Sequence, residues 1–394
     1  MGAFSSATGT FATAIGESSN ANGIQATAVG VSSIANGANA TATGVLSNAT
    51  GFNATATGAN AIANGQFATA TGAGANATGA AATATGLGST ATGTFATATG
   101  FNGSATGDTA TATGAGSVAN RTNATATGAA SIAVGEAATA SGALSNAHGS
   151  NASATGTFSN AAGDFSTATG SNATATGANA TATGESSTAT GASATAMGQR
   201  SVANGTTASA YGQQSLANGD ATTALGQGST ASATGATAIG RGASALAANS
   251  VAIGAGSVAT LANTVSFGTP GNERRLTNVA AGVNPTDAVN MSQLSGLTSG
   301  FQSQVSSLQS QIGENRTEAR RGIAAAVATA SAPMPSAPGK TTWQVRGSTF
   351  QSEAGFGFGF AHRLNTSMPL SVVGGYGNGG GTQHTAYVGI GGEF

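Results

Sequence analysis

A glycine recurs at every seventh position through most of this sequence, and this repeat constrains the fold more than any other feature. From Gly2 to Gly226 every seventh residue is glycine except Arg121, and the phase then continues at intervals of fourteen as far as Gly268. Two alternating halves, one typically ending in ATATG and the other often in ANG, make a fourteen-residue unit. Internal repeats of this regularity indicate a solenoid.

The residues that precede each glycine predict strands. Where apolar side chains occur they stand three and one positions before the glycine, as Val251 and Ile253 do in SVAIG, and a spacing of two is the strand period. Because glycine turns left-handed without steric cost, we expect it to form the corners. Residues 1–268 are therefore predicted to form a head of nineteen coils, roughly 90 Å long at about 4.8 Å per coil. One coil encloses little volume, so several rods should associate laterally.

Composition separates this region from the rest of the chain. The 394 residues include 63 Gly and no Cys, carry 6% charged residues and have a net charge of -1. These values exclude a basic nucleic-acid scaffold and a disulfide framework. All six prolines follow residue 269, so the head region contains none. A disordered linker is the alternative that composition suggests, but the unbroken glycine phase favours an ordered repeat.

Residues 269–293 are predicted to be a neck between the head and a helix. Asn284 can cap a helix, Pro285 suits its first turn and Asp287 suits its positive end, so we expect the helix to start there. Charged residues crowd this segment, where a wide head must narrow onto a coil, and we interpret them as interchain ion pairs that fix the junction. They are Glu273, Arg274, Arg275 and Asp287.

Residues 294–332 are predicted to be a coiled-coil stalk that continues into a helix passing through a membrane anchor. Its apolar positions recur after eleven residues, which favours a straight or right-handed coil, and its other positions are polar, so the stripe needs partner helices. The predicted coil core is Leu294, Leu297, Phe301, Val305, Leu308 and Ile312. Prolines from residue 333 onward end the helix.

Residues 333–394 contain four segments, each about the length of a tilted membrane-spanning strand, roughly 9 to 11 residues. Apolar residues alternate with small ones, which is typical of an outer-membrane barrel. Four strands cannot close a barrel, so several chains must contribute. The predicted lipid-facing residues are Phe356, Phe358, Phe360, Val388, Ile390 and Phe394, and the predicted lumen-facing residues, which leave room for the helices, are Gly357, Gly359, Gly389 and Gly391. Trp343, Tyr376 and Tyr387 suit the membrane interface.

Three motifs together resemble the trimeric autotransporter adhesins of the YadA type. SVAIG at 250–254 is similar to their head repeat, GNERRLTNVAAGVNPTDAVNMSQL at 271–294 to their neck, and the last hundred or so residues to their membrane anchor. The resemblance implies a homotrimer with a left-handed parallel β-roll head, a coiled-coil stalk and a twelve-stranded barrel to which each chain gives four strands.

The resemblance also implies a function. Such a barrel, inserted into outer-membrane lipid with the barrel-assembly machinery, exports its own head by type V secretion. The head then attaches to host cells, extracellular matrix or other bacteria. The sequence departs from the family pattern in its Thr-rich head, its short stalk and its start, where no signal peptide precedes the in-phase Gly2. We therefore expect a processed, truncated or engineered terminus.

Rows of Thr-x-Thr, such as Thr41 and Thr43, offer an alternative function. A flat Thr array on a solenoid could bind ice or a mineral surface, and a passive spacer is a third possibility. We favour an interior position for these rows, because Ile253 and similar residues occupy the same places and buried hydroxyls can bond along the stack. Arg121 is read as tolerated drift, with a local bulge or an anion contact as alternatives. No metal spacing or nucleophile-base pair arises, so neither an enzyme nor a cofactor is expected.

Overall fold

A computed structural model describes residues 2–329 and 331–393. The chain divides into two compact units, Met1–Arg275 and Leu276–Phe394. Phe394, predicted to face lipid, lies outside the described residues.

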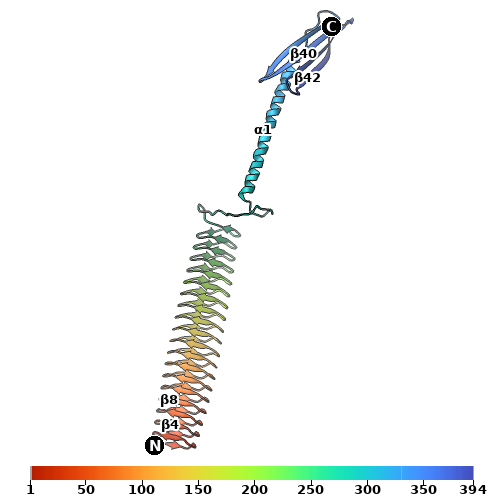
Figure 1. Ribbon diagram of the computed structural model, residues 1–394. Coiled ribbons are helices and arrows are strands. Elements are labelled where there is room, and N and C mark those ends of the chain that lie inside the picture. The colour runs from red at the N-terminus through yellow and green to blue at the C-terminus, as the bar shows by residue number, and fades with distance from the viewer. Residues whose placement is uncertain (1, 330, 394) are drawn as a thin grey trace. The chain divides into compact units, whose positions relative to one another are not determined.

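The first unit is a stack of short parallel strands (Figure 1). Odd-numbered strands begin with β1 (Ser6–Ala7) and follow at intervals of fourteen residues to β37 (Val258–Ala259). Even-numbered strands begin with β2 (Thr13–Ile15) and follow at the same interval to β36 (Val251–Ile253) and the shorter β38 (Val265–Ser266). Nineteen strands fall in each series. The predicted number of coils and the fourteen-residue unit are confirmed.

Each strand pairs in parallel with the strand one coil further on, in unbroken register. Thr41 of β6 (Thr41–Thr43) lies opposite Thr55 of the next coil, and Ile34 of β5 (Ile34–Ala35) lies opposite Asn48. The strands of one coil therefore have their hydrogen-bonding partners in the coils above and below. The fold of the head is a parallel β-solenoid.

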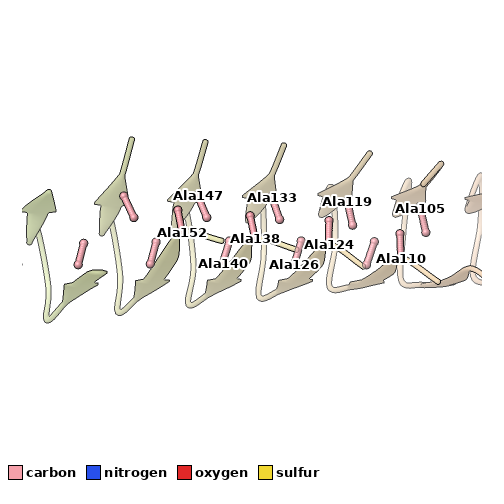
Figure 2. Packing of buried hydrophobic residues seen from close by; sticks show 14 of the residues in the cluster. Ala105, Ala110, Ala119, Ala124, Ala126, Ala133, Ala138, Ala140, Ala147 and Ala152 are labelled. Atoms are coloured by element: carbon pink, nitrogen blue, oxygen red, sulfur yellow. The ribbon is translucent and has the colours of Figure 1, made fainter. Parts of the chain in front are cut away.

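The core of the head is alanine and serine, so the predicted interior is wrong. Ala40 and Ala42 are fully buried, whereas Thr41 is half-buried and Thr43 is exposed. Figure 2 shows Ala126, Ala133 and Ala138 pointing into the space between the two rows of strands. A spacing of two identifies which residues share a face but not which face is inside. A fourteen-residue coil is so narrow that the space between its strands holds almost only methyl and hydroxymethyl groups, with Thr222 the largest side chain buried there. The threonine rows and the larger apolar residues lie outside.

Most buried serine hydroxyl groups in this core are satisfied within the coil, whereas Ser166 Oγ has no hydrogen-bond partner among the described residues. Ser33 Oγ donates to the carbonyl oxygen of Gly30 at 3.0 Å, and Ser47 Oγ donates to that of Gly44 at 2.9 Å. We expected the threonine hydroxyls to be the buried, hydrogen-bonded ones. In the structure the column of buried serines takes this place.

The glycines do not all serve as left-handed corners. Gly44 has a φ of 132°, but Gly37, in the other half of the repeat, has no positive φ. The left-handed turn lies two residues later, at Asn39 and Leu46, each with a φ of 58°. An added Cβ on Gly37 would collide with the carbonyl group of Gly51 in the next coil. The period-seven glycine is therefore required mainly because stacked backbones approach too closely for a side chain.

In the second unit, helix α1 (Met291–Ala328) begins six residues later than predicted. Asn290 is the N-cap and forms a capping box with Gln293, whose side chain also bonds the N–H and carbonyl of Gly282, both at 2.9 Å. Asp287 instead accepts from the N–H groups of Val283 and Asn284, at 3.0 and 2.9 Å, and closes a turn. The Asn284 start is therefore wrong, because a stronger cap lies downstream.

Four antiparallel strands complete this unit: β39 (Thr341–Phe350), β40 (Glu353–Arg363), β41 (Leu370–Asn378) and β42 (His384–Gly392). They pair in sequence order, so β39 and β42 are the two edges of the sheet. The four strands lie within residues 333–394, where four segments of strand length are predicted. No helix within 2–329 and 331–393 is long and apolar enough to cross a membrane.

Candidate assembly and attachment surfaces

One face of the four-stranded sheet is apolar and exposed. Phe356, Phe358 and Phe360 point outward from β40 with exposures of 56, 41 and 37%, and Val388 and Ile390 on β42 are 79 and 73% exposed. The structure therefore brings together the described residues that were predicted to face lipid. Two further residues belong to this face through their register: Trp343 is opposite Phe360, and Val345 is opposite Phe358. Val345 could have been found by extending the alternation into the first strand.

The opposite face is lined with glycine and carries the end of helix α1. Ala324, Ala325 and Ala328 of the helix are buried. An added Cβ on Gly357 would collide with the backbone of Ala328, and one on Gly377 would collide with that of Ala325. The absence of these side chains lets the helix backbone lie directly on the sheet. Sequence reasoning missed Gly377, although its register opposite Gly357 could have identified it.

The other predicted lumen glycines share this face but have different neighbours. Gly359 is buried. A Cβ on Gly389 would lie 3.4 Å from Val373 Cγ2, and one on Gly391 would lie 3.5 Å from Met334 Cε. Tyr387, expected at the membrane interface, has its ring against Gly375 on this inner face. Tyr376 is on the outer face, opposite Ala386 and beside Phe358.

An ion pair also ties the helix to the sheet. Arg321 Nε donates to Glu353 Oε2 at 2.9 Å, and it is the one salt bridge within the described part of the chain. The two side chains are partly exposed, at 39 and 25%. Ser348 Oγ adds a hydrogen bond to the carbonyl oxygen of Ala324. Sequence reasoning missed this pair, because nothing in the spacing of residues 321 and 353 indicates that they meet.

The apolar stripe of α1 has no partner among the residues that the structure describes. The six predicted coil-core residues are each roughly half exposed or more, from Leu294 at 49% to Ile312 at 65%. They occupy one side of a helix whose other positions are polar. Such a stripe is characteristic of a helix that packs against other helices.

The four charged neck residues do not pair with one another in the chain. Glu273 Oε1 accepts from the N–H of Gly271 at 2.8 Å, which lowers the pKa of this carboxyl group. The N–H groups of Asn284 and then Val283 likewise lower the pKa of Asp287. Arg274 donates to Ser257 Oγ at 2.7 Å and to the carbonyl oxygen of Phe267 at 3.1 Å. Interchain ion pairs at this junction stay a prediction, as does any role of Arg275.

The outside of the head presents side chains in rows. Toward the C-terminal end of the head, apolar residues replace the threonines of these rows, and Leu225 and Ile239 there are 46 and 37% exposed. Several phenylalanines occupy corners, among them Phe95 at 65%, and the rings of Phe52 and Phe67 meet edge to face at 5.5 Å. These corner residues were missed, because the corners were taken to be glycine alone.

Arg121 is exposed and stands where the neighbouring coils have glycine. The hydrogen bond from Asn120 N to the Ala133 carbonyl oxygen is 3.3 Å long, against 2.9 Å for Thr106 to Ala119 in the coil before it. This one hydrogen bond is longer beside Arg121, while the backbone of Arg121 lies as close to Gly107 as the glycines of other coils lie to one another. Within the described ranges no group of three or more His, Asp or Glu side chains is placed to hold a metal.

Comparisons with known proteins identify both the head and the stalk. Residues 275–317 match the coiled stalk of trimeric autotransporter adhesins. The YadA head domain repeat matches residues 1–20, 7–33, 21–47, 49–75, 77–102, 105–131, 147–173, 168–194, 189–215, 217–243 and 245–269.

Two individual proteins are similar to parts of this chain. The chain is 34% identical over 87 residues to autotransporter adhesin NhhA of Neisseria meningitidis serogroup B (strain ATCC BAA-335 / MC58), a match that spans 22% of this chain and 14% of that relative. A solved structure, the collagen-binding domain of the Yersinia adhesin YadA, is 26% identical; the match covers 57% of this chain and 86% of that one, with a TM-score of 0.23. The head repeat matches well over half of the residues of this chain, and the chain therefore belongs to the YadA-like trimeric autotransporter adhesins.

Proposed function

We propose that the chain is a bacterial surface adhesin that assembles as a homotrimer in the outer membrane. Each chain would give four strands to a twelve-stranded barrel and expose its head at the cell surface. The observation that carries this proposal is the sheet β39–β42, which has an apolar outer face, an inner face filled by its own helix, and two edges with no partner strand among the described residues.

Physical chemistry favours closure of this sheet by other chains. In lipid, each unpaired backbone group on an open edge costs several kcal/mol by a rough estimate. Three copies, joined from β42 of one to β39 of the next, remove all six edges. The lumen would then hold three helices, each lying on the glycines of its own sheet.

The stripe on α1 also supports association of several chains, through a coiled coil. Six exposed apolar residues along one side of the helix would become the core of a coiled coil. In the head, the outer face of the even-numbered strands is the best candidate for contact between chains. Its threonines give way to Leu225, Ile239 and Ile253 at the base, which suits a face that becomes buried on assembly.

The proposed activity is attachment, after export of the head through the anchor as in type V secretion and insertion with the barrel-assembly machinery. Its ligands would be host cells, extracellular matrix or other bacteria, and neither a cofactor nor catalysis is involved. Rows of identical side chains over many coils and three chains make weak contacts multivalent. The family matches do not favour an ice-binding rod or a passive spacer.

The experiment is to display the chain on a Gram-negative host with an added export signal. Attachment to immobilised matrix proteins and to cultured cells is measured before and after external protease. We expect display-dependent attachment that protease abolishes while the anchor stays in the outer membrane. Displayed heads that attach to nothing in the panel would contradict the adhesive role, and thermal hysteresis of the purified chain would support ice binding instead.

A further inference from the structure

A row of polar side chains runs along one corner of the head, toward its C-terminal end. It occupies the residue after the glycine in five successive coils: Glu185, Gln199, Gln213, Gln227 and Arg241. Gln199 Nε2 donates to Glu185 Oε2 at 2.9 Å, Gln213 Nε2 to Gln199 Oε1 at 2.8 Å, and Gln227 Nε2 to Gln213 Oε1 at 2.9 Å. We call these five residues the glutamine ladder.

The ladder has a direction, because the carboxylate of Glu185 can only accept hydrogen bonds. Each glutamine therefore donates toward the N-terminus and keeps one N–H free, and Gln199 and Gln213 also accept from the C-terminal side. All five side chains are exposed. The guanidinium of Arg241 meets no carboxylate among the residues that the structure describes. The ladder is thus a row of amides with an acid at one end and a base at the other.

The adjacent column, one residue further along each coil, differs in size between the two ends. Arg200 stands beside Gln199, whereas Gly228 and Gly242 stand beside Gln227 and Arg241. A Cβ added to either glycine would meet nothing within 4 Å. A groove is lined there by Gln214, Gln227, Gly228, Arg241, Gly242, Ala255 and Gly256. A large side chain therefore projects near the acidic end, and a hollow lies near the basic end.

These two columns are complementary to their own reversed copies. A two-fold axis through Gln213, perpendicular to the stack, places Glu185 opposite Arg241, Gln199 opposite Gln227 and Gln213 opposite itself. The same axis places Arg200 opposite Gly228. Both copies have the same rise, about 4.8 Å per coil, so every pair matches at once. A parallel arrangement would instead place Glu185 against Glu185 and Arg241 against Arg241.

We propose that the glutamine ladder is a contact surface between the heads of two antiparallel copies of this protein. Such contacts arise where heads projecting from two facing cells overlap, so this inference rests on the proposed surface display. Amide side chains stacked at the strand spacing pair readily with a second such row. The two end charges set the direction, because they attract in the antiparallel arrangement and repel in the parallel one.

Charge reversal on full-length protein tests the surface. Cells in two colours display wild type, Glu185→Arg, Arg241→Glu or the double variant, and clumping is counted within and between colours. Each single variant should clump roughly tenfold less with itself, because weak contacts multiply over many copies. Mixing the two single variants should restore clumping, and the double variant should clump with itself but not with wild type. Glu17→Arg, in the same column but outside the ladder, should clump like wild type.

Other outcomes overturn the proposal. Wild type that does not clump, single variants that clump normally, or mixed single variants that do not recover would exclude the ladder as a homotypic contact. A double variant that prefers wild type to itself would indicate parallel packing. Variants that lose attachment to matrix while clumping is unchanged would make the ladder a matrix-binding surface. Surface protease accessibility reports display separately, and sedimentation of the purified full-length variants tests the same pairings if display fails.

Discussion

The head and the C-terminal unit both depend on small residues, but only in the head do successive repeats supply one another's backbone partners. In the head, Ala42 and its equivalents are buried between strands of the same coil, and successive coils supply the backbone partners. In the C-terminal unit, Gly357 admits the chain's own helix, yet Phe358 and Phe301 remain exposed and β39 and β42 each have one edge without a partner strand in the described ranges. A repeat supplies its own neighbours along the stack, whereas a single helix and four strands need other chains.

The largest expected effect comes from filling the contact between helix and sheet. Gly357→Leu would force a side chain into the backbone of Ala328, and overpacking of this kind typically costs about 1 to 3 kcal/mol in each chain. The substitution is present in each of the three chains of the proposed trimer, so its cost is counted three times. We therefore expect the trimer band, seen on a gel when the sample is not boiled, to disappear. Gly347→Leu is the matched control, since Gly347 lies on the exposed face of the neighbouring strand with its nearest contact at 4.0 Å. Equal trimer loss in both variants would contradict the account.

Truncation of the stalk stripe should weaken assembly by a smaller amount. Phe301 is 60% exposed in the single chain, so Phe301→Ser costs a monomer little. In a coiled coil it removes about 2 kcal/mol of apolar burial per chain. The measurement is the temperature at which the detergent-extracted trimer dissociates. Gln302→Ser, on the polar side of the helix, should leave that temperature unchanged, and a Phe301→Ser trimer as stable as wild type would exclude this stripe from the core.

In the head, enlarging a core residue should matter more than enlarging its neighbour. Ala42→Val adds two methyl groups to a fully buried position and should destabilise its coils by about 1 to 3 kcal/mol. Thr41→Val, one residue earlier on the outer face, changes shape little and should be nearly neutral. Amide hydrogen exchange of the surrounding strands compares the two. A greater loss of protection in Thr41→Val than in Ala42→Val would indicate that the threonine rows lie in the interior.

The smallest effect is a pH dependence in the neck. Hydrogen bonds from Asn284 and Val283 lower the pKa of Asp287, so the folded turn favours the ionised carboxyl group. Its stabilisation is present above the ordinary aspartate pKa of about 3.9 and is lost as the pH falls through the lower folded value. The protection factors of the Val283 and Asn284 amides, which compare their exchange with the intrinsic rate at each pH, should therefore fall on acidification in wild type and lose this dependence in Asp287→Asn. Identical pH profiles for the two proteins would contradict this role.

The sequence predicts the periodic features of both units. It does not predict which face of a strand is buried, or which residues far apart in the sequence come into contact. The glycine phase is sufficient for the number of coils and their pairing. It could not show that Ala42, not Thr41, lies inside, because both faces of a strand obey the same period. The alternation in β40 correctly separates Phe358 from Gly357. The helix start was misplaced because Asn284–Pro285 and Asn290–Gln293 both resemble caps, and only the second forms reciprocal bonds. The pair Arg321–Glu353 has no local signal.

The most direct test of the central claim is the mass of the complex extracted from the outer membrane in mild detergent, measured by native mass spectrometry. If three chains complete one sheet and one coiled coil, the detergent-free mass is three times that of the 36.8 kDa chain, and boiling reduces it to one. A complex of one or two chains that remains folded in the membrane would contradict the account.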